Sequence, residues 1–183
     1  MKIAKLKIEE NIAEYILYMY QIEDTLRAFE LNLDHIMNRL VEPQLEDESD
    51  ILAYRNWYTD LINKMKIQKI EKKGHFVELN ELIIELSYLH NTLLTITNDH
   101  KYKDLVERST PFVEEFKNKS NLTDKNTIEV LLHAMYMKLL LKLSKKPISN
   151  ESEEAFDSMR IQLGYLVAAY HKMKKGNLDF LSN

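Results

Sequence analysis

Apolar residues recur at spacings of three and four along most of the chain, which is the pattern of amphipathic helices. Turn residues and charged runs interrupt this pattern and divide the chain into seven predicted helices. These helices cover about residues 8–30, 34–41, 50–70, 77–97, 102–119, 125–145 and 151–175. Pro111 is expected to kink or divide the fifth helix, because proline lacks the N–H group that an interior helical turn uses.

The first predicted helix has two apolar faces. One face is a stripe of Ile12, Tyr15, Met19, Ile22, Leu26 and Phe29, and the opposite face carries Ala13, Leu17, Tyr20 and Ala28. Asp24 falls in the middle of the second face, where a buried carboxylate needs a partner, and Arg27 is the nearest candidate. This pair, with Glu23 beside it, could line a polar cavity that Tyr18 or Tyr20 enters. We favour a purely architectural pair, which is the commoner role of a buried ion pair.

The composition also indicates a helical fold. The 183 residues include only three glycines and three prolines, so sharp turns are few and helix-forming residues dominate. A chain of this length can bury roughly 70% of its unfolded surface in one core. We therefore predict an all-α, single-domain antiparallel bundle of about seven helices over residues 1–175. A flexible C-terminal tail is expected at 176–183.

Charge and cysteine content narrow the expected environment and partners. The chain has no cysteine, which suits a reducing cytoplasm, and its N-terminus does not resemble a secretory signal. No uncharged apolar segment reaches the length of a membrane-spanning helix, so no membrane partner is expected. The net charge of −4 does not favour nucleic acid. Lysines that end the third and sixth predicted helices are interpreted as favourable charges at helix C-termini.

The six histidines lack the spacings that helical metal sites use. None has a glutamate three residues before it, and no His-Glu-x-x-His sequence occurs. No arginine is followed four to six residues later by a histidine, which disfavours a helical ribonuclease of the HEPN type. Glycine-rich phosphate loops and the serine-hydrolase elbow are also missing. The sequence therefore assigns no catalytic residue, metal ligand or cofactor.

His90 is the most informative histidine, because leucines surround it on the apolar face of the fourth predicted helix. We expect it to be largely buried, and we favour a core histidine that hydrogen-bonds a tyrosine or a carbonyl over a general base. His75 follows Gly74 at the start of that helix, where it could cap the helix or line a pocket. The candidate polar pocket comprises Tyr18, Tyr20, Asp24, Arg27, Trp57, His75 and His90.

Two features suggest contacts with other helices or with other molecules. Trp57 lies at the margin of an apolar stripe on the third predicted helix, where it could belong to the core or to an interface. Gly164 and Ala168 are four residues apart on the last helix, and their small side chains would let a second helix approach closely. That helix could come from the same chain or from a second copy, so a homodimer or another protein partner is expected.

Three stretches carry a family resemblance: the run NIAEYILYMYQIEDTLRA, the pair Trp57–Tyr58, and Gly74–His75 before a leucine-rich helix. Together they resemble an uncharacterised family of small all-helical bacterial cytoplasmic proteins, classified as a domain of unknown function. The resemblance covers nearly the whole chain. It implies a single domain and a bacterial cytoplasmic origin, and it implies no activity.

The leading functional hypothesis is a non-enzymatic cytoplasmic protein that acts by self-association or partner binding. It rests on the abundant apolar helix surface and on the missing catalytic patterns. The alternative is a small-molecule-binding or enzymatic bundle, with a polar pocket around Asp24, Arg27 and His90.

Overall fold

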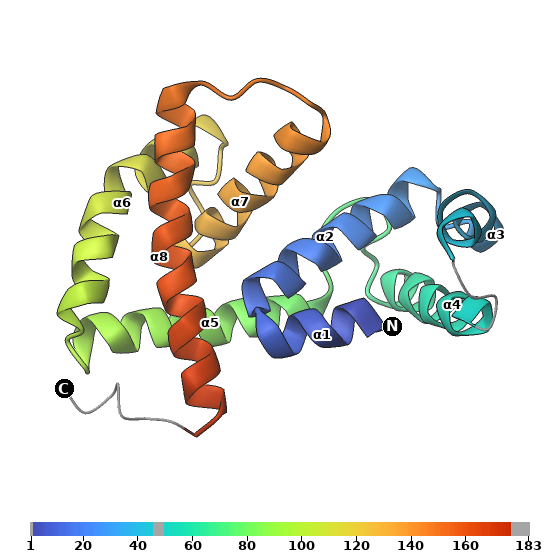
Figure 1. Cartoon of the computed structure of the whole chain (residues 1–183), viewed down its shortest axis with the longest axis horizontal. Helices are drawn as coiled ribbons and strands as arrows, with labels where there is room; N and C mark the ends of the chain where they lie inside the picture. Colours follow the sequence, from blue (N-terminus) through green and yellow to red (C-terminus); the bar gives the residue numbers. More distant parts are fainter. Residues whose placement is uncertain (1, 46–49, 177–183) are drawn as a thin grey trace. The chain divides into compact units, whose positions relative to one another are not determined.

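The computed structural model of the chain describes residues 2–45 and 50–176, and the regular structure of these residues is entirely helical (Figure 1). Eight α-helices lie in this part of the chain, which confirms an all-α helical bundle. The chain forms two compact units, Met1–Asn80 and Glu81–Asn183. The single domain over 1–175 stays a prediction. All of the expected tail except Gly176 lies outside the described residues.

The first unit begins with two helices, α1 (Lys2–Glu10) and α2 (Ile12–Ala28), which pack against each other. The prediction of one continuous helix over residues 8–30 is therefore wrong. Asn11 has an extended backbone, and its side chain accepts a hydrogen bond from the N–H of Glu14, so a new helix starts there. This break leaves the apolar spacing of three and four intact, which is why the spacing did not reveal it.

Short helical turns connect α2 to the next long helix. They are α3 (Leu33–Ile36), the π-helical turn η1 (Met37–Val41) and the 3-10 turn η2 (Glu42–Gln44). The long helix α4 (Ile51–Ile67) packs against α3 and η1. Helix α5 (Val77–Thr95) begins within the first unit and continues into the second.

The second unit contains three further helices, α6 (His100–Lys119), α7 (Thr127–Leu143) and α8 (Asn150–Lys174). Helix α8 packs against both α6 and α7, and α6 also packs against α7 (Figure 1). Pro111 lies inside a continuous α6, so it does not divide that helix. Pro111 is exposed. At an exposed position the carbonyl group four residues earlier, which proline leaves without a helical hydrogen bond, can be hydrated instead.

Side-chain caps fix where most of these helices begin. Five N-cap side chains in the described part of the chain accept a backbone N–H: Asn11, Asn32, Asp99, Asn126 and Ser149. At α7 the cap is a full capping box, in which Glu129 reaches back to the N–H of Asn126. Local sequence therefore determines these starts.

The apolar stripes predicted from the sequence form the cores. In α2, Ile12, Met19, Ile22 and Leu26 are buried, and Tyr15 and Phe29 are half-buried. In the second unit, Leu86, Leu89 and Leu93 of α5 are buried, as is Leu166 of α8. None of the described helices is both long enough and apolar enough to cross a membrane.

Candidate functional site

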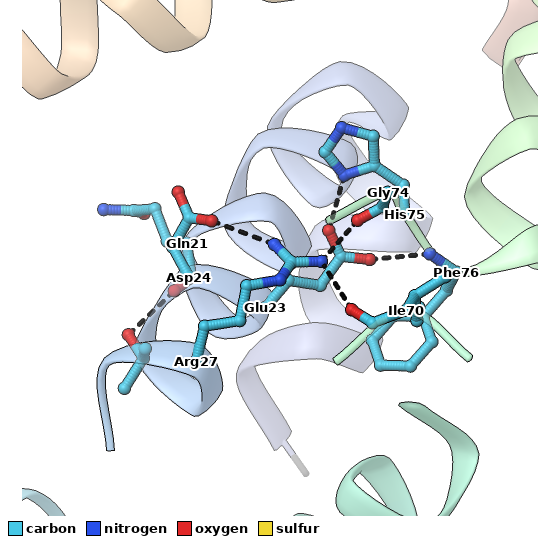
Figure 2. A network of polar contacts seen from close by, with 9 residues as sticks. Gln21, Glu23, Asp24, Arg27, Ile70, Gly74, His75 and Phe76 are labelled. Carbon is cyan, nitrogen blue, oxygen red and sulfur yellow. Dashed lines mark hydrogen bonds and ion pairs between the residues drawn. The ribbon is translucent and has the colours of Figure 1, made fainter. Parts of the chain in front are cut away.

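The first unit holds a fully buried carboxylate, Glu23 of α2, whose side chain is 0% exposed. One of its oxygens accepts a 2.7 Å hydrogen bond from the backbone N–H of Phe76, and the other lies 2.5 Å from Nδ1 of His75 (Figure 2). Burial of a carboxylate is costly unless its oxygens are hydrogen-bonded, and here both are engaged. Glu23 therefore ties α2 to the two residues that precede α5.

His75 lies between Glu23 and an aromatic ring. Its imidazole stacks on Tyr20 with ring centroids 3.8 Å apart and planes inclined by 23°. The side chain is 27% exposed, so the ring has one edge against the buried carboxylate and part of its surface at the solvent. A carboxylate that contacts one ring nitrogen can orient the imidazole, so that the second ring nitrogen can transfer a proton or bind a ligand.

Arg27 holds the turn that joins α4 to α5. Its guanidinium donates to the carbonyl oxygens of Ile70, at 3.2 Å, and of Gly74, and it forms a 3.0 Å ion pair with Asp24 (Figure 2). Gly74 adopts a φ of +96°, and a Cβ built there would lie 3.3 Å from Cγ2 of Ile70. The turn therefore needs glycine at this position and an arginine to satisfy its carbonyl groups.

The structure reverses the predicted roles of two neighbouring acidic residues. Asp24 is exposed, with 52% of its side-chain surface accessible, and it pairs with Arg27 at the surface. The buried carboxylate belongs to Glu23, which lies one position and about 100° away on the helix. Glu23 is spaced four residues from Met19 and three from Leu26, so it lies at the edge of the buried stripe, but this spacing alone does not decide which of the two carboxylates is covered.

Of the seven candidate residues predicted from the sequence, six lie in the first unit and His90 lies in the second. Tyr20, Arg27 and His75 meet around Glu23, with Asp24 on the outer side of Arg27. Tyr18 lies near the tyrosines of α4, and burial raises its pKa, with smaller contributions from Tyr58 and Tyr54. Trp57 packs edge-on against Tyr58, with ring centroids 4.9 Å apart, and is half-buried.

His90 belongs to the second unit, where it has an architectural partner. Its Nδ1 lies 2.7 Å from the hydroxyl of Tyr102, and the two rings meet edge to face. Burial lowers the pKa of His90, which favours the neutral imidazole. Tyr102 in turn stacks on Tyr165, whose hydroxyl donates to Asp99 at the N-terminus of α6. The predicted hydrogen bond to a tyrosine or a carbonyl is confirmed for a tyrosine, and the side chain is half-buried where a largely buried one was expected.

An open groove runs between the C-terminal half of α6 and the N-terminal half of α8. It has a volume of about 340 Å³. The residues that line it are Phe112, Glu115, Phe116, Lys119, Glu151, Ser152, Glu154, Ala155, Phe156 and Met159. Rings of Phe116 and Phe156 lie 6.3 Å apart and form part of an aromatic floor. We call this feature the acidic groove, because of the charges on its rim.

The rim of the acidic groove carries three glutamates and one lysine. Glu115 and Lys119 form a 2.5 Å ion pair along α6. Glu151 and Glu154 are exposed on α8. Because Lys119 is paired with Glu115, the charges of Glu151 and Glu154 are not balanced within the rim. The rim therefore favours a ligand with positive charge. The floor favours a ligand with apolar side chains. Sequence reasoning missed the groove, because it depends on how α6 and α8 pack.

Phe116 also lines a second hollow of about 160 Å³ on the α7 side of α6. Two residues of α7 that line this hollow, Met137 and Leu140, are 43% and 37% exposed. The C-terminal end of α6 therefore has apolar surface on two sides.

Gly164 and Ala168 of α8 are both exposed, and no heavy atom lies within 4 Å of a Cβ built on Gly164. In the described part of the chain, no helix makes the close approach that these small residues would allow. Across the same residues, no group of three or more histidine, aspartate and glutamate side chains could hold a metal ion.

The comparisons with known proteins identify a family and no function. No curated protein matches the sequence, and no solved structure matches it. Residues 1–177, nearly the whole chain, match a family described as a domain of unknown function. The chain belongs to this family, DUF4924.

Proposed function

We propose that the chain is a non-enzymatic cytoplasmic binding protein whose acidic groove holds an apolar, positively charged helical segment of a protein partner. The observation that carries this proposal is the groove itself, which combines an open volume of about 340 Å³ with a floor of phenylalanines and an acidic rim. An amphipathic helix commonly binds in such a groove through apolar anchors spaced three and four residues apart. The cytoplasmic location rests on the cysteine-free sequence.

The charge pattern sets the chemistry of the partner. Lysine or arginine side chains beside the apolar anchors would face Glu151 and Glu154, and an acidic segment would be repelled by them. The apolar anchors would cover Phe112 and Phe116, the half-buried phenylalanines that line the groove. Burial of apolar surface would supply most of the affinity, and the rim charges would supply selectivity and orientation.

The alternative, a small-molecule or enzymatic pocket, draws on the contact between Glu23 and His75. A carboxylate 2.5 Å from an imidazole is an arrangement that general-base catalysis uses. However, both oxygens of Glu23 are engaged by the turn before α5, and Arg27 is engaged by backbone carbonyl groups. These contacts hold the turn without a ligand, although Nε of Arg27 is buried and makes no hydrogen bond. Because most of the polar atoms of the cluster are engaged by the turn, we favour binding at the acidic groove.

A labelled synthetic peptide tests the proposed function. Its helix would carry leucines on one face and lysines on the other, and fluorescence anisotropy would measure its binding to the full chain. We expect binding that weakens as salt is added, because exposed charges are screened. A peptide with glutamates in place of the lysines should bind at least about tenfold more weakly, a difference of roughly 1.4 kcal/mol.

Two sets of variants locate the binding site. Glu115→Lys with Glu154→Lys reverses one charge on each wall of the groove and should abolish the preference for the lysine peptide. Glu107→Lys with Glu81→Lys makes the same change in net charge at exposed positions outside the groove lining. If both double variants lose affinity for the lysine peptide equally, the attraction depends only on net charge and the groove is not the binding site.

A further inference from the structure

A second positively charged, apolar feature lies on the same chain, at the end of α4. Ile67 is the last residue of this helix, and 80% of its surface is exposed. Residues 64–73 contain five lysines and one glutamate. We call Ile67 and the lysines around it, Lys66, Lys69, Lys72 and Lys73, the basic knob.

The basic knob comprises the end of α4 and the turn that follows it, and hydrogen bonds hold this turn in place. Gln68 accepts a 2.9 Å hydrogen bond from the N–H of Val77 and donates to Glu78 at 3.2 Å. Lys64 adds a 2.7 Å ion pair to the same glutamate. Arg27 binds the carbonyl groups of Ile70 and Gly74. Because these contacts already order the chain beside Ile67, little conformational entropy is lost when a partner binds there.

We propose that the occupant of the acidic groove is the basic knob of a second copy of this chain, so that the protein self-associates through a knob-and-groove contact. This inference rests on the proposed function, because it names the partner that the acidic groove binds. Ile67 would cover the aromatic floor, and the lysines beside it would face Glu151 and Glu154. The two surfaces are complementary in both hydrophobicity and charge.

Two other exposed apolar residues, Ile84 and Leu143, fit the acidic groove less well. Ile84 of α5 is 66% exposed, but Glu81 and Glu85 lie on either side of it in the sequence. Leu143 at the end of α7 is 61% exposed and has Lys142 and Lys145 beside it, which makes it the rival segment. We choose the knob at Ile67 because it is more exposed and has more lysines.

Sedimentation velocity of the full chain tests the proposal over about 1–100 μM at low salt. Wild type should exceed the monomer mass increasingly as concentration rises, and added salt should reverse this association. Two variants alter one surface each: Lys66→Glu with Lys69→Glu for the knob, and Glu115→Lys with Glu154→Lys for the groove. Each should stay monomeric at concentrations at least about tenfold above those at which wild type associates.

Two rescue experiments separate a specific contact from general charge effects. An equimolar mixture of the knob and groove variants should form a heterodimer, because one intact knob and one intact groove are then on different chains. A chain that carries all four substitutions should self-associate again, since its reversed knob fits its reversed groove. Circular dichroism should show native helix content for every variant.

Specific outcomes would overturn this inference. They are a wild type that is strictly monomeric, a mixture that gives no heterodimer, and association that Leu143→Ser removes but Ile67→Ser does not. The peptide experiment distinguishes this failure from failure of the proposed function. If the lysine peptide binds the groove while the chain stays monomeric, the groove has another partner and only the self-association is wrong. If neither occurs, both proposals fail.

Discussion

The buried carboxylate of Glu23 lies 2.5 Å from Nδ1 of His75, a residue 52 positions further along the chain. The same carboxylate accepts the N–H of Phe76, so one side chain of α2 fixes the start of α5. Through this contact and through Arg27, α2 supports the turn that follows α4, whose last residue is the exposed Ile67. The polar cluster around Glu23 therefore holds the turn between α4 and α5.

Removal of the buried carboxylate should destabilise the first unit far more than removal of its exposed neighbour. Glu23→Ala leaves the N–H of Phe76 without its acceptor and creates a small void, so we expect a loss of about 2–4 kcal/mol in unfolding free energy. Asp24→Ala removes a half-exposed carboxylate that pairs with Arg27 and should cost about 1 kcal/mol or less. Urea unfolding measures both. Equal losses would show that Glu23 is not the structural carboxylate.

Two glycine substitutions should have opposite effects. Gly74→Ala forces a side chain into a φ of +96° and against Ile70, which should destabilise the protein by about 1–2 kcal/mol. Gly164→Ala lies in an exposed part of α8 with open space around it, and should stabilise the protein by about 0.5–1 kcal/mol. Thermal unfolding compares the two. A destabilising Gly164→Ala would mean that this face of α8 is covered.

Arg27→Lys should loosen the turn after α4 and leave the rest of the fold intact. Lysine keeps a charge beside Asp24, but it cannot match the planar guanidinium that binds two carbonyl groups and a carboxylate together. We expect faster amide hydrogen exchange in residues 70–76 and weaker self-association, with little change in overall helix content. Hydrogen exchange measured by mass spectrometry reports the first effect. Unchanged exchange across this turn would contradict the assigned role.

Stability should fall on the acidic side of neutrality in a way that depends on His90. Burial lowers the pKa of His90 from 6.5, so the folded state favours the neutral ring. The contribution of neutral His90 to the free energy of unfolding is present above about pH 6.5, and it is lost as the pH falls through the lower pKa of the folded state. His171 has its pKa lowered too, by burial and by Lys175. The lowered pKa values of Glu78 and Glu85 affect stability only below about pH 4.5.

Urea unfolding at several pH values between 5 and 7.5 checks this assignment. His90→Asn should reduce the loss of stability across this range, and the contribution of His171 should persist. Tyr102→Phe provides the matched comparison. It removes the hydroxyl that contacts both His90 and Gln162 but leaves the ring buried, so it should lower stability at every pH and keep the pH dependence. If His90→Asn leaves the slope of the wild type unchanged, His90 does not cause it.

The sequence by itself determined the all-α fold, most helix bounds and the family. These features are local: helix spacing, caps such as Asn126 and the scarcity of glycine and proline act within a few residues. His90 was also foreseen as a histidine bonded to a tyrosine, because the leucines around it marked its burial. The break at Asn11 is local as well, but the apolar periodicity continues through it.

Only the tertiary structure decided which acidic residue is buried, what Arg27 holds, and where a groove opens. Glu23 and Asp24 are adjacent, and the choice between them depended on the turn at residues 70–76, which packs against one side of α2. The acidic groove likewise depends on how α6 packs against α8. Such features join residues that are distant in sequence, and helical periodicity records which face of a helix is covered but not what covers it.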